Sequence, residues 1–576
     1  MKMQPTTKGT LLLAIKDNIT WSGIMEAEKK SIRAVVRDSY KNFTLNNLYP
    51  SRYRAACKAS VIPGNVVFLE IREKGITDNF RMIRAALEKR NQRLDEEEAG
   101  RGGEVRDVSG ELSDDNAARN MLKTEQGITA GSRRAADQSI SESEAGSIIQ
   151  NTRDSESDSA IQNTRDSEHG RGRDRRHRGD GFRWEMSVIC IREGMENRGI
   201  VMKNCLSAIP KLARAQFIFV NEVSYFLSSL PIRPETTVIQ TWHACGAFKK
   251  FGYSAVGSGF GTTREDLEKY PVHRNFSYVT VSAPEVEWAY AEAFHMEDHP
   301  ERIIPVGVSR TDMFFSSSYR KKAREKVAWI LRRMAPRLFL GSGSGNSGVS
   351  DPADAGHRMS SHEIYARLGD VYSDRAADRE HVPDLSLVPG KKIILYAPTF
   401  RGTVGRAASP DALDIREMKR ALSKDYVLLI NHHPFVRAKD RPKIPEGCGD
   451  FAFDMTDQLA IEELLTAADI CITDYSSLIF EYSLFERPMI FFAFDLENYL
   501  DERGFYYPIS EMMPGPVCST TQDVINVLTD HGSEAGFDLA RVREFKYRFM
   551  SGCDGHATSR LLQLMDKCME AQGRRR

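Results

Sequence analysis

The stretch ADICITDYSSLIFEYSLFERPMIFF, residues 468–492, decides the fold class. Two short apolar runs, DICITD at its start and RPMIFF at its end, have the composition of buried strands. Between them the segment SLIFEYSLFERP carries apolar residues at helical spacing and begins at two serines, Ser476 and Ser477. A strand, a helix and a second strand in this order predict a βαβ unit with parallel strands.

The same alternation extends in both directions along the chain. Further strands are predicted in the runs VVFLEI, SVICI, AQFIFVN, TTVIQTW, FSYVTVS, RIIPVG, KKIILYAPTF and YVLLIN. Asp78 and Asn79 are suitable N-caps for a helix after the first of these runs, and its apolar periodicity ends at about Leu87. Another helical segment, residues 539 to about 568, closes the pattern. The sequence therefore predicts an α/β protein of two Rossmann-like domains that face each other across a cleft, with ligands at the carboxyl ends of the strands.

Two segments interrupt this pattern. Residues 93–182 are rich in charge, Ser and Gly, and IQNTRDSE occurs in them twice, at 149–156 and 161–168. Such a composition buries too little apolar surface to offset the entropy of ordering, so we predict a disordered insertion. A second segment that includes GSGSGNSG predicts a linker or a surface insertion. The predicted order is a basic N-terminal segment (1–60), an N-terminal domain (61–336, with the insertion at 93–182), the linker (337–388) and a C-terminal domain (389–576).

Composition excludes several classes of protein. The 576 residues contain 80 basic and 80 acidic side chains, which argues against nucleic acid as a partner. We expect no transmembrane helix, because no run of about 18 apolar residues occurs, and no signal peptide, because the N-terminal apolar run is short and lacks a cleavage site. The nine cysteines form no CxxC pair, which favours a reducing cytosol over a disulfide framework or a zinc site.

The first candidate residues follow the run TTVIQTW. His243 stands at the end of this strand, and Lys249 and Lys250 come shortly after it. A histidine beside small residues and two cations can act as a general base next to an anion site. A structural histidine with solvated lysines explains the same pattern equally well.

Four further candidate residues lie in the C-terminal half. His433 precedes Pro434, which holds it in an extended conformation and can direct its side chain at a cleft, although a turn histidine is the simpler interpretation. Ser476 and Ser477, where a strand becomes a helix, predict a phosphate pocket that is compatible with ordinary capping. Glu481 is on the same helix face as Ser477 and can reach a ribose hydroxyl, or it can be a solvated glutamate.

Nucleoside triphosphate and metal sites are not indicated. The chain has no GxxxxGK[ST] loop and no GxGxxG after a strand. Acidic residues such as Asp469 and Asp474 lack the clustering of a two-metal centre. We therefore predict neither a metal nor a cofactor.

These motifs together resemble the CDP-glycerol glycerophosphotransferase family, whose members build or prime teichoic-acid-type poly(glycerol phosphate). The similar segments are QTWHACGAFKKFGYS, GVSRTD, ILYAPTFRG, the His-Pro pair after a strand, and residues 468–507, and the similarity spans residues 66–86 and 186–564 outside the insertions. The resemblance implies a GT-B fold and transfer of glycerol phosphate from CDP-glycerol to a hydroxyl, with release of CMP.

The resemblance also assigns roles to residues. It implies that His243 is the catalytic base and that His433 contacts the donor diphosphate. The substrate-binding residues that it implies, together with those from the patterns above, are Lys249, Lys250, Arg310, Asp312, Thr399, Arg401, Asp474, Ser476, Ser477 and Glu481. The chain departs from the family pattern at Ala244, Cys245 and Ser309, where the family has Gly, a frequently polar residue and Pro.

Two alternative functions stay open. One is a CDP-ribitol phosphotransferase or another GT-B transferase that uses a nucleotide sugar, because no motif separates glycerol from ribitol. The other is a non-catalytic scaffold member, which Ala244 and the insertions suggest and the presence of both His243 and His433 disfavours.

The N-terminal segment suggests a membrane partner. Residues 29–58 carry eight basic side chains and one acid, Asp38, and Ile32, Val35, Val36, Tyr40 and Phe43 form an apolar stripe at helical spacing. Such a helix can lie on an anionic leaflet or can pack on the first domain. With a lipid-linked glycerol phosphate acceptor implied by the resemblance, we expect a cytoplasmic protein that binds the inner face of the membrane peripherally.

Overall fold

The computed structural model describes residues 32–104, 183–257, 263–339, 387–402, 406–497, 499, 504–530 and 537–573. The chain divides into a compact unit, Met1–Asp95 with Gly179–Arg576, and a second unit, Glu96–Arg178, inserted into it. Most of the predicted insertion (105–182) and of the predicted linker (340–386) lies outside the described residues. The architecture below belongs to the first unit.

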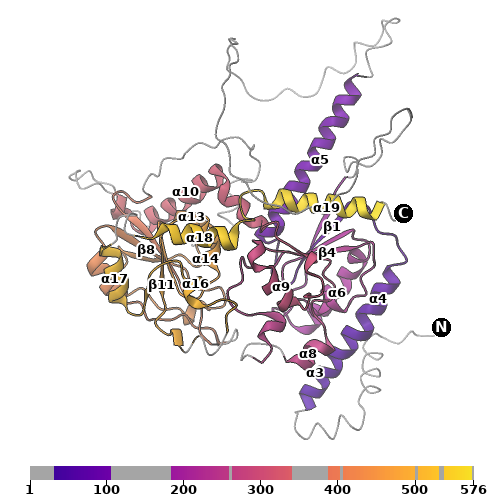
Figure 1. Ribbon diagram of the computed structural model, residues 1–576, viewed down its shortest axis with the longest axis horizontal. Coiled ribbons are helices and arrows are strands. Elements are labelled where there is room, and N and C mark those ends of the chain that lie inside the picture. Colours follow the sequence, from indigo (N-terminus) through magenta and orange to yellow (C-terminus); the bar gives the residue numbers. More distant parts are fainter. Residues whose placement is uncertain are drawn as a thin grey trace, which may run out of the picture. The chain divides into compact units, whose positions relative to one another are not determined.

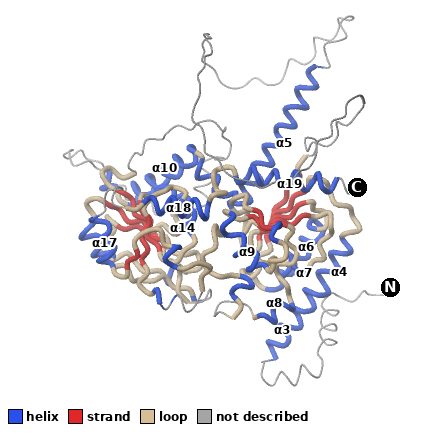
Figure 2. Tube along the Cα trace, viewed as in Figure 1, coloured by secondary structure: helices blue, strands red, loops and turns tan. Residues whose placement is uncertain are grey.

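Two six-stranded parallel sheets form the framework, as Figures 1 and 2 show. In the first sheet the strand order is β2-β1-β3-β4-β5-β6, and in the second it is β12-β11-β10-β7-β8-β9. The strands of the first sheet are β1 (Asn65–Glu70), β2 (Glu185–Cys190), β3 (Phe217–Val220), β4 (Thr237–Gln240), β5 (Tyr278–Thr280) and β6 (Ile303–Ile304). Those of the second are β7 (Lys392–Ala397), β8 (Tyr426–Ile430), β9 (Ala452–Asp454), β10 (Ile470–Thr473), β11 (Met489–Phe492) and β12 (Val517–Cys518).

Every strand predicted from an apolar run is present, so the prediction of an α/β protein with parallel sheets is confirmed. The short strands β9 and β12 were not predicted, because AFD and VC are too short for periodicity to identify them. Whether the two halves face each other in the GT-B manner stays a prediction.

Helices surround both sheets. In the N-terminal half they are α3 (Ile32–Phe43), α4 (Tyr49–Ala56), α5 (Asp78–Glu104), α6 (Arg198–Leu212), α7 (Tyr225–Ser229), α8 (Arg264–Lys269), α9 (Glu287–Phe294) and α10 (Ser317–Met334). In the C-terminal half they are α12 (Ile415–Leu422), α13 (Ile461–Ala467), α14 (Leu478–Ser483), α16 (Ile509–Met512), α17 (Thr521–Asp530), α18 (Leu539–Met550) and α19 (Ala557–Gly573). A π-helix, Thr44–Leu48, joins α3 to α4, and 3₁₀ turns occur at Gly252–Ala255, Pro284–Val286, Pro300–Arg302, Ser309–Phe315, Pro336–Phe339 and Ala438–Asp440.

Helix α5 is longer than its apolar periodicity predicted. It continues past Leu87 to Glu104 and so includes the first residues that were expected to be disordered. Strong helix formers and the ion pair between Arg84 and Glu88 support this extension. Arg183 also pairs with Asp95 at 3.0 Å, which joins the helix to the start of β2.

The C-terminal helical segment is two helices. After α18 the chain turns, and α19 packs on one face of the first sheet, where Leu561 and Met565 join Phe68 and Phe219 in one apolar cluster. Arg90 of α5 binds Asp566 through two hydrogen bonds, of 2.7 and 2.9 Å. The end of the chain is therefore part of the core of the N-terminal half.

The predicted amphipathic segment forms α3 and α4, although Lys29 and Lys30 lie outside the described residues. The Tyr40 hydroxyl donates to Met202 Sδ at 3.2 Å, and Lys41 pairs with Asp266 at 3.1 Å. Tyr53 is fully buried. Part of the apolar stripe thus packs on the N-terminal half. Among the described helices, none is long and apolar enough to cross a bilayer.

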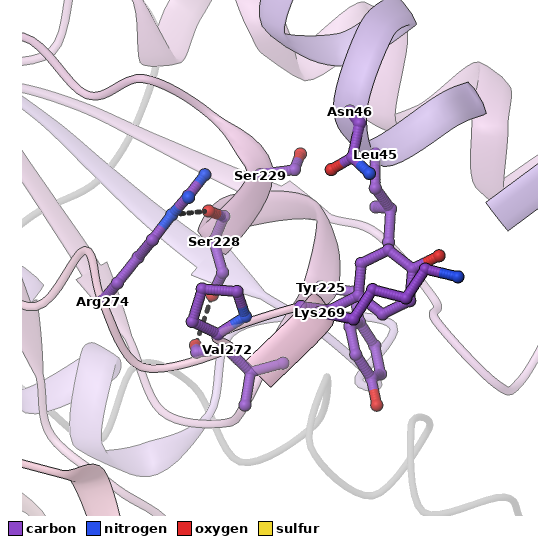
Figure 3. A pocket seen from close by; sticks show the side chains of 10 residues that line it. Leu45, Asn46, Tyr225, Ser228, Ser229, Lys269, Val272 and Arg274 are labelled. Atoms are coloured by element: carbon purple, nitrogen blue, oxygen red, sulfur yellow. Dashed lines mark hydrogen bonds between the residues drawn. The ribbon is translucent and has the colours of Figure 1, made fainter. Parts of the chain in front are cut away.

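A small cavity of about 30 Å³ lies beneath the same segment (Figure 3). Leu45 and Tyr225 lie on one side of it, and Ser228 and Arg274 on the other. On this side Arg274 Nε donates to the Ser228 carbonyl at 2.8 Å and the Ser228 hydroxyl donates to the Val272 carbonyl, while the buried hydroxyl of Tyr270, which also lines the cavity, has no hydrogen-bond partner among the described residues. A space of this size holds about one water molecule, so the cavity is a structural feature.

Candidate active site

The candidate residues lie where the strand order of each sheet reverses. In the first sheet the chain proceeds from β1 to β2 on one side and then returns to β3 on the other, and in the second sheet β7 and β10 are related in the same way. Parallel sheets leave a crevice at the carboxyl ends of such strands. Asn221 follows β3, Thr399 follows β7 and Asp474 follows β10, and His243 comes shortly after the neighbouring β4.

His243 stands in a cavity of about 390 Å³ at this edge of the first sheet. Its ring packs against Trp242 at 4.3 Å between ring centres, and Nδ1 lies 3.3 Å from the backbone carbonyl oxygen of Asn221. Since a carbonyl only accepts hydrogen bonds, Nδ1 carries the proton of the neutral ring and Nε2 carries the lone pair. The local structure therefore gives His243 the tautomer of a base.

The protonation state agrees with this tautomer. The imidazole is exposed to the cavity, but the surrounding protein mass and the cations of Arg310 and Arg72 lower the pKa of His243 to about 4. The hydrogen bond to Asn221 acts in the opposite direction, and solvent in the cavity makes the shift smaller. The pKa of His243 is nevertheless lowered, so the ring is neutral at pH 7. His243 is thus in the form that can take up a proton.

Asn79 holds the loop that carries His243. The sequence indicated this residue only as a possible helix cap. Its side-chain amide donates to the Trp242 carbonyl at 3.1 Å, and its Oδ1 accepts from the backbone N–H of Arg310 at 2.9 Å. Trp242 has φ +53°, an uncommon value for a non-glycine residue. The bond from Trp242 N to Gln240 Oε1, 2.8 Å, also stabilises this turn.

The substitution of Gly by Ala at position 244 does not distort the turn. Ala244 is outside the left-handed region, and the positive φ of the loop falls on Trp242 and on Gly246, with φ +62°. A Cβ atom at Gly246 would lie 2.3 Å from the ring of Phe480, so this position requires glycine. The backbone geometry thus gives no support to an inactive site at Ala244.

Arg310 and Glu481 form a buried ion pair, with side chains 12% and 9% exposed. Arg310 also donates to the His243 carbonyl at 2.9 Å. The solvated alternative for Glu481 is therefore wrong: the helix turns this side chain toward the N-terminal half, where the charge of Arg310 compensates its burial. Through this pair the C-terminal half contacts the loop of His243.

Asp312 has a structural contact in this fold, and its expected role in substrate binding stays a prediction. Both of its carboxylate oxygens accept backbone N–H groups at the start of α19, from Ala557 at 3.0 Å and Thr558 at 2.8 Å. A carboxylate at this position satisfies N–H groups that have no partner within the helix. Asp312 therefore fixes α19 to the segment that carries Arg310.

Glu462 is a member of the cavity that sequence analysis missed. It lines the same cavity as His243 and Arg310, although it comes from α13 in the C-terminal half. Burial and the nearby charge of Asp78 raise the pKa of Glu462 to about 7. Only the tertiary fold brings it to His243, because it precedes the recognisable DICITD motif and belongs to no motif of its own.

The two lysines after His243 do not line this cavity among the described residues. Lys249 Nζ lies 5.2 Å from the centre of the Tyr499 ring, and the backbone of Lys250 donates to the Gly504 carbonyl at 3.2 Å. The structure therefore places Lys249 beside the C-terminal half, near the residues that follow β7 and β10.

Thr399, Arg401 and Asp474 form one network. Asp474 Oδ1 accepts from the N–H groups of Thr399 at 2.9 Å and Tyr475 at 2.7 Å, and its Oδ2 accepts from the Thr399 hydroxyl at 2.9 Å and Arg401 at 3.0 Å. Arg401 in addition binds Asp495 through Nε and Nη2, and Thr399 through Nη1.

These bonds use the full capacity of two expected substrate ligands. All five N–H groups of Arg401 and all four acceptor positions of Asp474 are occupied within the protein. The structure thus gives Arg401 and Asp474 a role in shaping the loop after β7, and their contact with substrate stays a prediction.

His433 has the opposite tautomer to His243. Its Nδ1 accepts a hydrogen bond from the backbone N–H of Phe435 at 3.2 Å, so the proton of the neutral ring is on Nε2. The ring packs between Phe400 and Phe435, at 4.8 and 4.9 Å between ring centres. The neighbouring His432 is buried, and Nδ1 of its ring lies 2.7 Å from the Ser409 hydroxyl, which is a structural contact.

Ser476 and Ser477 precede α14. The Ser476 hydroxyl accepts from the backbone N–H of Leu478 at 3.4 Å, and Ser477 occupies the N-cap position without a capping bond from its side chain. Both are partly exposed. Their phosphate-binding role stays a prediction. Among the described residues, no group of three His, Cys, Asp or Glu side chains is arranged to hold a metal ion.

Comparison with known proteins adds to this geometry. Residues 185–331 and 366–567 match the family model of CDP-glycerol:poly(glycerophosphate) glycerophosphotransferase. The chain is 34% identical over 372 residues to the teichoic acid ribitol-phosphate primase of Bacillus spizizenii, covering 64% of this chain and 79% of that protein. It is 25% identical over 346 residues to the teichoic acid glycerol-phosphate primase of Bacillus subtilis, covering 60% and 72%.

A solved structure is similar in fold. A histidine-to-asparagine variant of the wall teichoic acid polymerase TagF superposes with a TM-score of 0.53 at 18% identity, covering 95% of this chain and 98% of that chain. At this identity the similarity concerns the fold alone.

Proposed function

Because the chain belongs to the CDP-glycerol:poly(glycerophosphate) glycerophosphotransferase family, we propose that it transfers glycerol phosphate from CDP-glycerol to a hydroxyl of a lipid-linked glycerol phosphate acceptor and releases CMP. Its relatives include teichoic acid primases and polymerases, and the chain is a transferase of teichoic acid synthesis. The donor and the acceptor are the proposed part of this function.

The observation that carries the proposal is the tautomer of His243. An acceptor hydroxyl is a weak nucleophile at neutral pH, and a neutral imidazole with its lone pair on Nε2 can take the proton during attack. The acceptor oxygen forms a bond to the phosphorus that bears glycerol, the bond from this phosphorus to the oxygen of CMP breaks, and the acceptor proton is left on His243. The Asn221 carbonyl, which accepts from Nδ1, stabilises the imidazolium that results.

The departing CMP needs stabilisation of its negative charge. The proton on His433 Nε2 and the hydroxyls of Ser476 and Ser477 are the donors that we assign to the donor diphosphate. The network of Arg401, Asp474 and Thr399 holds the loop beside them. In this proposal His243 accepts a proton and His433 donates a hydrogen bond, because their Nδ1 atoms have different partners.

A ribitol donor is the second candidate, favoured by the 34% identity to a ribitol-phosphate primase. The test measures CMP release by the purified full chain with CDP-glycerol and with CDP-ribitol, each with and without a lipid-linked glycerol phosphate acceptor. We expect acceptor-dependent release from CDP-glycerol. CMP release from CDP-ribitol but not from CDP-glycerol would mean that the donor is CDP-ribitol. CMP release from neither compound would support the non-catalytic scaffold alternative.

We also propose that the protein binds the cytoplasmic face of the membrane through its basic N-terminal segment. Four cations on or just after α3 and α4 are exposed and can approach anionic lipid: Arg37, Arg52, Arg54 and Lys58. A lipid-linked acceptor requires such proximity.

A further inference from the structure

The cavity around His243 has unused capacity to accept hydrogen bonds. Nε2 of His243 carries a lone pair, as shown by the partner of Nδ1. Asn221 is 5% exposed and lines the cavity, and its Oδ1 is buried without a hydrogen-bond partner. In the described part of the chain, the Glu462 carboxylate forms no ion pair and no hydrogen bond with another residue. Of these three acceptors Asn221 Oδ1 is buried, whereas His243 and Glu462 are open to the cavity, so all three can accept hydrogen bonds from a ligand.

The arginines that line the same cavity are already engaged. Arg310 binds Glu481 and the His243 carbonyl. Arg81 pairs with Asp78 at 2.8 Å and donates to the Ile76 carbonyl at 3.3 Å. A phosphate group brings only acceptors, so it would form no hydrogen bond with His243 Nε2 or Asn221 Oδ1. A ligand end that carries several hydroxyl groups fits the unused hydrogen-bonding capacity.

The cavity also has a solvent-exposed rim, which includes Glu73 and Lys74. These two side chains carry opposite charges and are both hydrated, so they do not add a net charge to the cavity. The acceptors of His243, Asn221 and Glu462 therefore decide which ligand the cavity takes.

We propose that this cavity binds the terminal polyol of the acceptor, with Glu462 accepting a hydrogen bond from a hydroxyl adjacent to the one that His243 deprotonates. The proposal rests on the proposed function and adds the acceptor side of the site to it. Glu462 is then a positioning residue that selects acceptors with two neighbouring hydroxyls at their end.

The surroundings of Glu462 suit this role. Glu463 binds Lys326 of α10, and its carboxylate accepts from the Ala460 N–H at 3.2 Å, which fixes the first turn of α13. Asp78 and Glu222, the neighbouring acids of the cavity, are compensated by Arg81 and Arg72. Glu462 therefore lies on a helical turn that its neighbour Glu463 holds in place. Among the described residues that line the cavity, no cation lies at ion-pair distance from its carboxylate.

The test compares two acceptor analogues in the full-length protein. Both have a glycerol phosphate linkage, and one ends in a free vicinal diol while the other has a single terminal hydroxyl. For the wild type we expect kcat/KM with the diol to be about 10- to 100-fold higher, the range typical of one hydrogen bond to a charged group. In Glu462→Ala this preference should fall to about twofold. The change should come through the KM of the diol acceptor, and Glu462→Gln, which keeps an acceptor oxygen, should restore part of the preference.

Two controls separate the possible failures. Glu446→Ala alters an exposed carboxylate elsewhere and should leave the preference unchanged. Binding of the diol analogue without donor, measured by calorimetry, reports on the cavity independently of turnover. If wild type binds the diol analogue through Glu462 but releases no CMP, the proposed function fails and the site stands. If wild type turns over and Glu462→Ala keeps the full preference, the role of Glu462 is wrong.

Discussion

At the scale of single residues, the chemistry depends on which ring nitrogen carries the proton. His243 donates through Nδ1 to the Asn221 carbonyl, whereas His433 accepts at Nδ1 from the Phe435 N–H. The first arrangement leaves a lone pair on Nε2 and the second leaves a proton there. Under the proposed function, His243 is therefore suited to act as a base and His433 as a hydrogen-bond donor, because of backbone groups that sequence motifs do not display.

His243→Ala should abolish turnover while donor affinity stays within a few-fold. Loss of a general base typically lowers the rate about 10²- to 10⁴-fold. Because the surrounding protein mass and the cations of Arg310 and Arg72 lower the pKa of His243 to about 4, the acid limb of kcat for the wild type should lie well below pH 6. CMP release measured from pH 4 to 8 tests both points. A variant with more than half of wild-type turnover would contradict the role of His243, and an acid limb near pH 6.5 would contradict the lowering of its pKa.

Arg401→Lys should destabilise the protein and raise the KM for the donor. A lysine cannot reproduce the fork that binds Thr399, Asp474 and Asp495, so we expect a loss of about 2–4 kcal/mol in the free energy of unfolding. Denaturant titration measures this loss. Arg420→Lys, at an exposed ion pair with Glu417, is the matched control and should change stability by less than about 1 kcal/mol. Equal effects of the two substitutions would mean that the network is not important for stability.

At the scale of elements, helices connect parts of the chain that are distant in sequence. Helix α19 packs on the first sheet, and Asp312 caps it. Close to this cap, the segment after β6 approaches the turn between α18 and α19: Gly307 has φ +90°, and a Cβ atom there would lie 1.9 Å from the Gly552 carbonyl oxygen. Glycine thus permits the contact that joins the last helix to the first sheet.

Gly307→Ala should therefore be strongly destabilising. The left-handed backbone conformation costs about 1–2 kcal/mol for alanine, and the collision with Gly552 adds about 1–3 kcal/mol. Gly447→Ala is the control, because Gly447 has φ +82° but open space around the added atom, and it should show the backbone cost alone. Thermal unfolding of both variants measures the difference. Similar melting temperatures would argue against close packing at Gly307.

The N-terminal helices yield a prediction about membrane binding. Changing the exposed Arg52, Arg54 and Lys58 to Glu should reduce sedimentation with vesicles that contain anionic lipid, because each cation near the surface contributes about 1 kcal/mol. Binding of the wild type should also weaken with salt. Arg416→Glu, Arg420→Glu and Lys424→Glu combined, on and just after α12, control for total charge because they also reverse three exposed cations. If the N-terminal variant pellets as the wild type does, the membrane role of this segment is wrong.

At the scale of the whole molecule, contacts within the first unit join the two chain segments between which the insertion lies. Asp95 and Arg183 form an ion pair, and Asn91 exchanges two hydrogen bonds with the backbone of Trp184, at 2.9 and 2.8 Å. The strands β1 and β2, on either side of the insertion, are neighbours in register along their full length. These contacts hold the two ends of the insertion together within the first unit.

Removal of Gly100–Gly179, with a short Gly-Ser linker in its place, should leave folding and CMP release nearly unchanged. The reason is that the contacts between α5 and the start of β2 lie outside the deleted residues. Thermal unfolding and turnover of the deletion variant test this expectation. An insoluble product, or loss of a cooperative transition, would show that the insertion contributes to the core.

Local patterns in the chain were enough to specify the parallel strands, the two α/β halves and the strand-end positions of His243, His433 and Asp474, because apolar periodicity is a local property. The same patterns did not specify β9, the full length of α5 or the two-helix form of the C-terminal segment, where the local signal is weak.

Only the tertiary structure decides which side chains share a site. Glu462 joins the cavity of His243 from the other half of the chain, and Glu481 finds Arg310 in the same way. The tautomer of His243 depends on the Asn221 carbonyl, which the fold brings to it from the end of another strand. Contacts of this kind join residues far apart in sequence, and no short-range pattern of apolar and polar residues records them.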